Sequence, residues 1–207
     1  MTAYRLQKEA LKLKGVKNYR MYVNKNFKMD EMCNIYETFD VFQTMIFVFK
    51  KDDAIKLKEY LSQRGIKAEI LIGGIEQKQR DEIIDKFRLT TITTLICTNV
   101  LARGIDVPEV DLVINYDVPY INDFGYKLPD FANFMHRVGR TGRFGTDGVS
   151  LSFYTDETFE DLLDQIEKYY EIKIEKIDTL NDLKLILEQM RNKNIKLFYN
   201  KGVLGFW

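Results

Sequence analysis

The chain has 207 residues, 45% of them hydrophobic, so it is long enough to bury one substantial core. Lysine and arginine together number 31, as do aspartate and glutamate, which excludes an overall basic field that would collect nucleic acid. Two widely spaced cysteines, Cys33 and Cys97, argue against a disulfide framework and against a zinc site. The sequence contains no run of about eighteen apolar residues and no signal peptide, so we expect an intracellular, soluble protein.

Strand and helix patterns alternate along the chain. Apolar or alternating runs predict strands at 20–24, 44–49, 68–72, 93–97, 112–116 and 149–153. Helical periodicity predicts helices at 29–38, 76–87, 131–139, 159–170 and 183–190, and one more helix that Asp52 or Asp53 caps and Gly65 follows. Because each parallel crossover has to pass over the sheet, this alternation predicts an α/β fold in three layers, with a central parallel sheet flanked by helices.

Polar residues directly follow four of these predicted strands. They are Lys50-Lys51, Gly73-Gly74, Thr98-Asn99 and Asp117. In open α/β sheets, ligands bind outside the carboxyl ends of the strands. We therefore expect a ligand at this edge of the sheet.

The run from 136 to 145, His-Arg-Val-Gly-Arg-Thr-Gly-Arg-Phe-Gly, spaces three arginines three residues apart. Two guanidinium forks aimed at one point suit the charge that develops on a transferring phosphoryl group. We expect glycines 139, 142 and 145 to adopt conformations closed to other residues and to let the backbone approach a ligand. A helix end that carries arginines would need no ligand, but it would not need the interleaved glycines.

Residues 98–106, Thr-Asn-Val-Leu-Ala-Arg-Gly-Ile-Asp, together with the run 136–145 resemble motifs V and VI of the DEAD-box RNA helicases, in family order and spacing. Further matches are Lys50-Lys51, Gly74 with the Gln77 and Arg80 pair, and the segment 113–119. The resemblance covers roughly residues 10–180. It implies the second, C-terminal RecA-like domain of that family.

The sequence contains neither a Gly-x-x-x-x-Gly-Lys-Ser/Thr phosphate loop nor an Asp-Glu-x-Asp run. Only half of an active site is therefore expected, in a fragment of a longer enzyme or a separately made domain that hydrolyses no ATP alone. We predict an interdomain segment or N-terminal extension at 1–18, the RecA-like domain at 19–178 and a helical extension at 179–207. Basic and aromatic residues alternate in 191–207, where they would either stack single-stranded bases or pack on the domain or a partner.

The resemblance also implies roles for individual residues. Arg140 and Arg143 would act as catalytic arginine fingers on the terminal phosphate of ATP, with Mg²⁺ held mainly by the missing N-terminal RecA-like domain. Gly104 and Asp106 would complete the ATP-binding set. For Asp106 two interpretations remain open, namely a hydrogen bond to a ribose hydroxyl and a cap on the turn before Val107-Pro108.

Coupling to the missing domain is implied for three further residues: Arg103, His136 and Arg137. Contacts with RNA are implied for Lys51, Gly74, Gln77, Arg80, Thr98 and Asn99. These groups suit phosphate and sugar oxygens and do not read base edges, so binding would be independent of sequence. Taken alone, Gln77 and Arg80 would fit an ordinary solvated helix N-terminus.

The most similar branch is the nuclear-pore mRNA-export helicase. Its interdomain segment resembles 11–19, it shares Asn99 in motif V, and it too has a lengthened, glycine-containing stretch at 120–135. This branch implies an export activator protein with inositol hexakisphosphate, a monomer without membrane contact, and a location in the cytoplasm, at the nuclear pore and in the nucleus. The alternatives are a translation-initiation helicase and a stand-alone, non-catalytic RNA- or activator-binding module.

Overall fold

The computed structural model describes residues 15–38, 43–98, 110–142 and 148–200, with side chains up to 193. The central sheet contains strands β1 (Val16–Tyr22), β2 (Thr44–Val48), β3 (Ala68–Leu71), β4 (Thr94–Thr98), β5 (Leu112–Asn115), β8 (Gly148–Tyr154) and β9 (Ile174–Lys176). A separate hairpin is formed by β6 (Tyr120–Asp123) and β7 (Tyr126–Pro129). The helices are α2 (Lys28–Thr38), α3 (Lys51–Ser62), α4 (Gln77–Arg88), α5 (Phe131–Val138), α6 (Glu157–Tyr170) and α7 (Leu180–Asn200), with a 3-10 turn η1 at Lys25–Phe27.

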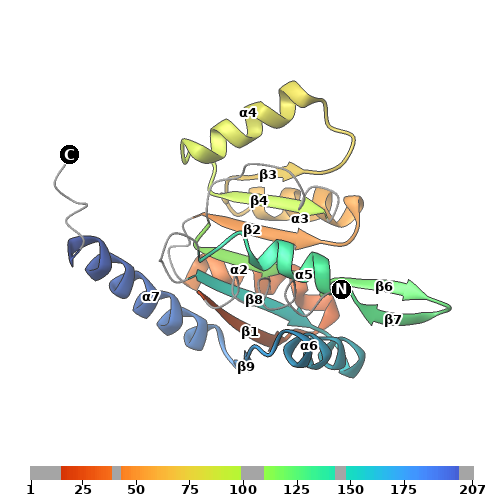
Figure 1. Cartoon of the computed structure of the whole chain (residues 1–207). Coiled ribbons are helices and arrows are strands. Elements are labelled where there is room, and N and C mark those ends of the chain that lie inside the picture. The colour runs from red at the N-terminus through yellow and green to blue at the C-terminus, as the bar shows by residue number, and fades with distance from the viewer. Residues whose placement is uncertain (1–14, 39–42, 99–109, 143–147, 201–207) are drawn as a thin grey trace.

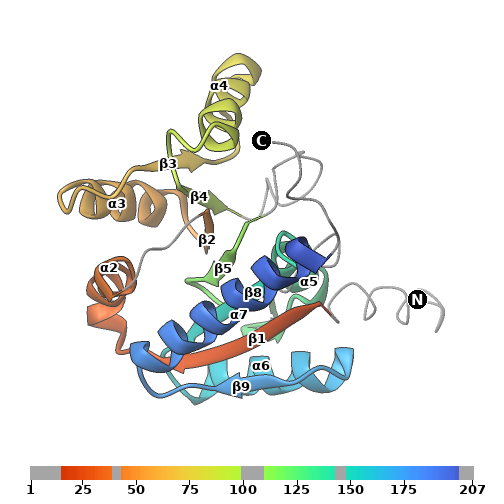
Figure 2. The ribbon, with the colours of Figure 1, turned by 90° about the vertical axis from the view of Figure 1, so that its left-hand side faces the viewer.

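The seven strands of the sheet lie in the order β3-β4-β2-β5-β8-β1-β9, and every neighbouring pair is parallel (Figure 1). Helices α2, α3 and α7 pack into one hydrophobic cluster on one face of the sheet. Helices α4, α5 and α6 pack on the other face, as the edge-on view shows (Figure 2). The predicted three-layer α/β fold is confirmed.

The central strands β2 and β4 are buried along their whole length, as expected for continuous apolar runs covered on both faces. Alternate side chains of each strand enter opposite layers. Ile46 lies in the cluster of α2, α3 and α7, and its neighbours Met45 and Phe47 lie in the cluster of α4. The core is therefore two layers that share one sheet.

Helix α3 begins earlier than the sequence predicted. Its N-cap is Lys50, which makes no side-chain capping bond, so the expected cap at Asp52 or Asp53 is wrong. Strand β2 ends at Val48 and leaves only two residues before the helix, so both aspartates fall in the first turn. There their charges still favour the positive end of the helix dipole.

Three features were not predicted, and one of them is the short edge strand β9. Strand β1 begins at Val16, ahead of the expected domain boundary at 19, and pairs with β8 from that residue on. The stretch after Pro119 forms the β6–β7 hairpin, closed by the two-residue loop Phe124-Gly125 with φ of 46° and 87°. Positive φ at both loop residues is typical of a type I′ turn, which matches the twist of the strands.

The predicted C-terminal helix is confirmed as α7. Its residues Leu183, Leu187 and Met190 are buried in the same core cluster as α2, so the helix packs on the domain. None of the helices in the described parts of the chain is both long and apolar enough to span a membrane.

Candidate functional site

Lys51 and Gly74 lie side by side at the carboxyl edge of the sheet. Lys51 is the first residue of α3, and Gly74 follows β3 with φ of 93°. A Cβ atom added to Gly74 would lie 3.9 Å from the Nζ of Lys51. A left-handed backbone favours glycine, so no side chain at position 74 covers the backbone next to the ammonium group of Lys51.

The start of α4 brings Gln77 and Arg80 together. The guanidinium Nη1 of Arg80 donates to Gln77 Oε1 at 3.4 Å, and Gln77 Nε2 donates to Asp81 Oδ1 at 2.8 Å. The Nε of Arg80 is buried and has no hydrogen-bond partner within the described residues. One donor of this arginine is therefore unpaired.

Thr98 ends β4 at the same edge and is only 4% exposed. Its Oγ1 is buried without a hydrogen-bond partner in the part of the chain that the structure describes. An unpaired buried polar group costs about 1–3 kcal/mol, so a ligand oxygen near Thr98 would recover that free energy. Together with the unpaired donor of Arg80, this unpaired hydroxyl supports a polar ligand at the carboxyl edge of the sheet.

Arg137, in the last turn of α5, is fully buried. Its Nη1 donates to Asn115 Oδ1 at 3.0 Å and to the backbone oxygen of Asp117 at 2.7 Å, and the guanidinium lies 5.1 Å from the ring centre of Phe47. Asn115 in turn donates from Nδ2 to Ser152 Oγ at 3.0 Å. Burial lowers the pKa of Arg137 to about 10, and the charges of nearby aspartates oppose this shift. The side chain stays charged at neutral pH.

This burial differs from the expectation that Arg137 couples to another domain. A side chain with 0% exposure contacts no surface partner unless it leaves its site. The physical reason is that Asn115 and the Asp117 carbonyl, at the end of β5, offer it acceptors inside the domain. Arg137 thereby ties α5 to the carboxyl end of β5.

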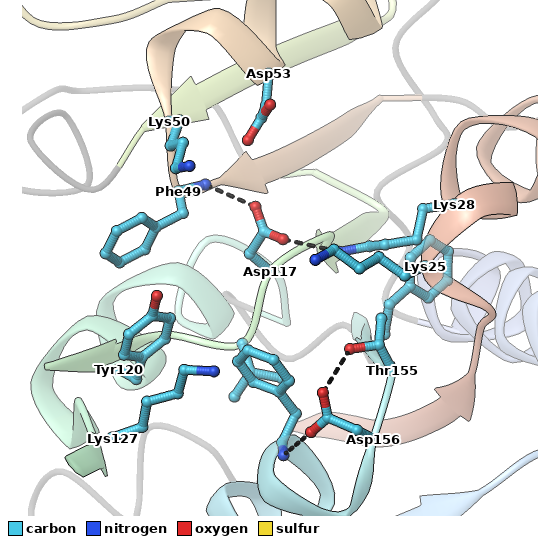
Figure 3. A pocket seen from close by; sticks show the side chains of 13 residues that line it. Lys25, Lys28, Phe49, Lys50, Asp53, Asp117, Tyr120, Lys127, Thr155 and Asp156 are labelled. Atoms are coloured by element: carbon cyan, nitrogen blue, oxygen red, sulfur yellow. Dashed lines mark hydrogen bonds and ion pairs between the residues drawn. The ribbon is translucent and has the colours of Figure 1, made fainter. Parts of the chain in front are cut away.

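Asp117 continues this connection to the start of α3. Its Oδ2 accepts a hydrogen bond from the backbone N–H of Phe49 at 2.8 Å, and its Oδ1 accepts one from Lys28 Nζ at 2.8 Å (Figure 3). Phe49 lies two residues before Lys51. A chain of polar contacts thus runs from α5 through Arg137 and Asp117 to the segment that carries Lys51; we call it the Arg137–Asp117 network.

The backbone of Arg140 lies near the start of β5, whereas Thr98 ends β4 at the carboxyl edge of the sheet. Helix α5 runs back against the direction of the strands, and the backbone oxygen of Arg140 accepts from Val110 N, just before β5 begins. Five strand residues at about 3.3 Å each put roughly 15 Å between the two edges. The Arg140 backbone thus starts at the amino edge, and the other predicted phosphate residues, Gly104, Asp106 and Arg143, lie outside the described residues. His136 is half-buried in the last turn of α5.

Arg140 and Arg137 both lie close enough to Cys97 to lower the pKa of its thiol, but burial dominates and raises that pKa to about 12. Cys97 and Phe47 belong to the cluster on the α4 face. The arginines at the end of α5 thus lie against this face of the sheet.

The glycines of the arginine run serve the fold where the structure describes them. Gly142 has φ of 73°, and a Cβ there would lie 2.7 Å from the oxygen of Gly15 and 2.8 Å from Val16 Cγ2. The close approach is thus to the start of β1, which corrects the expectation of an approach to a ligand at this glycine. Gly139 has an ordinary φ of −67°.

Several predicted residues lie outside the described residues. They are Asn99, Arg103, Gly104, Asp106, Arg143 and Gly145. Their proposed roles stay predictions.

Comparison with known proteins identifies the class. Residues 27–145 match the family model described as "Helicase conserved C-terminal domain", which is more than half of the chain. The chain therefore belongs to the family of helicase C-terminal domains. Within that family it is similar to the C-terminal domain of the DEAD-box protein Dbp5, with 35% identity and a TM-score of 0.78, covering 86% of this chain and 99% of that one.

Two further relatives agree. The ATP-dependent RNA helicase dbp5 of Aspergillus niger is 40% identical over 204 residues, which are 97% of this chain and 42% of that protein. S. cerevisiae Dbp5 bound to RNA and ADP BeF3 has 35% identity and a TM-score of 0.76, covering 86% of this chain and 45% of that one. The chain thus spans about two fifths of the curated relative's length, and its resemblance to the mRNA-export branch is confirmed.

Proposed function

We propose that this chain is the C-terminal motor domain of an ATP-dependent RNA helicase that acts in mRNA export. The observation that carries the proposal is the set of unpaired buried polar atoms on Thr98 and Arg80 near Lys51, together with Arg140 just beyond the end of α5. A physical connection between them, the Arg137–Asp117 network, suits an enzyme in which one ligand controls the other.

Around Arg140 the chain supplies half of a nucleotide pocket. Arg140 and Arg143 act as arginine fingers on the terminal phosphate of ATP, and Gly104 and Asp106 contact the rest of the nucleotide. Both the N–H and the oxygen of Arg140 are hydrogen-bonded within the domain, which fixes where its side chain starts. We assign Mg²⁺ mainly to the N-terminal domain, because this sequence lacks the phosphate loop that would hold the triphosphate and magnesium.

At the carboxyl edge the chain contacts the RNA backbone. The unpaired Oγ1 of Thr98 and Nε of Arg80 would meet phosphate or sugar oxygens, and Lys51 beside the bare backbone at Gly74 would neutralise a phosphate. Asn99 and Gln77 complete this surface. Backbone contacts of this kind bind RNA of any sequence, with affinity falling as salt rises.

The nucleotide contacts and the RNA contacts together give the mechanism. ATP and RNA each bridge this domain and the N-terminal RecA-like domain, so each stabilises the closed arrangement and favours binding of the other. Arg103 and His136 make contacts across the closed cleft. Once the terminal phosphate has left, the arginine fingers lose their partner, the domains reopen and RNA is released.

The partners follow from the solved relatives. S. cerevisiae Dbp5 variants have been solved bound to Gle1 with IP6, and bound to Nup159, Gle1, IP6 and ADP. We assign an activator protein with inositol hexakisphosphate to the enzyme that contains this chain, and a location at the nuclear pore as well as in the cytoplasm and nucleus.

The unpaired hydroxyl of Thr98 offers a direct test. In the full-length enzyme, Thr98→Val keeps the side-chain shape and removes the hydroxyl, and we expect weaker RNA binding and a higher RNA concentration for half-maximal ATPase. Ser150→Ala is the matched control, because Ser150 Oγ is also buried without a partner but lies inside β8. Equal effects of the two variants would contradict the RNA assignment. RNA binding without any ATPase would favour the stand-alone module.

A further inference from the structure

A pocket of about 280 Å³ lies at the carboxyl edge of the sheet, beside the proposed RNA surface (Figure 3). It is bounded by the ends of β2, β5 and β8, by the turn η1 before α2, and by the β6–β7 hairpin. One of its lining residues, Lys50, directly precedes Lys51. The proposed function assigns nothing to this pocket.

Most of the acidic groups in the pocket already have partners. Asp117 accepts hydrogen bonds from Lys28 Nζ and from the backbone N–H of Phe49. Asp156 caps α6 by accepting the N–H of Phe159 at 3.2 Å, and it also accepts the hydroxyl of Thr155 at 3.3 Å. Only Asp53 lines the pocket without a partner within the described ranges.

Three lysines in the pocket have no carboxylate partner within the same ranges: Lys25, Lys50 and Lys127. Lys25 and Lys50 are exposed. Lys127 lies over two rings, 5.4 Å from the centre of Tyr120 and 4.3 Å from that of Phe159. Three unpaired cations face one unpaired carboxylate, so the pocket favours an anion.

An aromatic stack forms one wall. Phe49 and Tyr120 are parallel to within 4°, with ring centres 4.8 Å apart, and Tyr120 meets Phe159 edge to face at 5.8 Å. Phe49 is the outer ring and is 37% exposed. Its exposed area can accept a further planar ring; Lys50 and Lys127 lie beside this wall, and Lys25 lies across the pocket next to Lys28 (Figure 3).

We propose that this pocket binds a further stretch of the single-stranded RNA, with one base stacked on Phe49 and the flanking phosphates neutralised by Lys25, Lys50 and Lys127. Alternating stacking surfaces and cations are how proteins hold single strands without reading sequence. Lys50 adjoins Lys51, so a strand bound at Lys51 reaches the pocket without a break. An acidic protein segment could pair with the lysines, but it would give no role to the stacked rings of Phe49 and Tyr120. This inference rests on the proposed function.

RNA length tests the proposal. The full-length enzyme, held closed with Mg²⁺ and a non-hydrolysable ATP analogue, is titrated with labelled oligouridine of about six and about twelve nucleotides. We expect tighter binding of the longer RNA when it is extended at one end only, because the pocket lies to one side of Lys51. In the Lys25→Ala and Lys50→Ala double variant the gain disappears, and binding of the short RNA stays unchanged.

Salt dependence and stacking give two independent readouts. Each phosphate contact contributes about 0.7 to the slope of log affinity against log salt for single strands, so the double variant should lose about 1.4 from the slope with the longer RNA. Phe49→Leu removes the ring and keeps the backbone N–H bond to Asp117; we expect about 5- to 100-fold weaker binding of the longer RNA. Phe49→Tyr retains a ring and should bind as the parent does. Lys67→Ala is the charge control, because Lys67 is exposed and precedes β3 at the opposite edge.

The outcomes separate the two proposals. If the parent enzyme does not bind even the short RNA, the proposed function fails. If the short RNA binds but extension at either end adds nothing, or if the variants keep the gain, the pocket proposal is overturned and the proposed function stands. Loss of a protein partner with unchanged RNA binding would likewise overturn it and mark the pocket as a protein-docking site.

Discussion

Replacing Asp117 with asparagine tests the Arg137–Asp117 network. The carboxylate accepts two hydrogen bonds at 2.8 Å, one from the Phe49 N–H and one from Lys28 Nζ. An amide retains one acceptor oxygen, so Asp117→Asn either loses the backbone bond or turns its NH₂ group toward the ammonium. In both cases Lys28, whose side chain is only 10% exposed, keeps its charge without a counter-ion.

The magnitude follows from partial burial. A hydrogen bond to a charged group is worth about 1.5–3 kcal/mol. The side chain of Asp117 is 23% exposed, so solvent screens part of the pair. We expect Asp117→Asn to lower the free energy of unfolding by about 2 kcal/mol, measured by urea denaturation with an unchanged m-value.

Two comparisons isolate the cause. In a Lys28→Met background no ammonium is left unpaired, so Asp117→Asn should cost about 1 kcal/mol or less. Glu175→Gln is the matched control, because the Lys173–Glu175 pair has the same 2.8 Å distance but is exposed; we expect no measurable change. An equal loss in both backgrounds, or a loss below about 0.5 kcal/mol, would refute the reasoning.

Three further predictions concern the fold. Phe124→Asn should slow amide exchange in the β6–β7 hairpin, because Phe124 is 97% exposed at φ of 46° and asparagine tolerates that conformation better; faster exchange would contradict this. Gly142→Ala should lower the free energy of unfolding by about 2 kcal/mol or more, because the new Cβ would clash with the start of β1. Gly65→Ala is the control: its φ of 76° is similar, but no atom lies within 4 Å of the new Cβ, so it should cost about 1 kcal/mol. Equal costs of the two variants would disprove the clash. Cys97 should resist a thiol reagent at pH 8 in the folded chain. Because the pKa of its thiol is raised from 9.0 to about 12 in the folded chain, the stability that it contributes is complete below pH 9 and lost between pH 9 and 12. In Cys97→Ala, the free energy of unfolding should no longer show this fall between pH 9 and 12.

The sequence predicted those parts of the fold that local patterns determine. The apolar runs of β2 and β4 and the helical stripe of α6 lie where periodicity placed them, within two residues. Strand β9 was missed because three residues carry no periodic pattern. The hairpin was missed because Phe-Gly takes the place of the usual Asn-Gly turn signal.

The site was harder to predict where contacts are distant in sequence. The three arginines of the run 136–145 are equivalent in the sequence pattern. Among the described residues, only Arg137 is turned inward, because it meets Asn115 and Phe47 on strands that are distant in sequence. The position of the Arg140 backbone near the start of β5 depends on α5 running back along the sheet. The long stretch at 120–135 was noticed in the sequence, but the pocket beneath it needed the folded positions of Lys25 and Phe49.

The central claim is that Arg140 belongs to a nucleotide pocket completed by another domain. The most direct measurement is RNA-stimulated ATP hydrolysis by the full-length enzyme with Arg140→Ala, beside the isolated 207-residue chain. We predict a fall in kcat of about 10³- to 10⁵-fold with unchanged thermal unfolding, and no hydrolysis by the isolated chain. Turnover that survives Arg140→Ala, or ATP hydrolysis by the isolated chain, would contradict the claim.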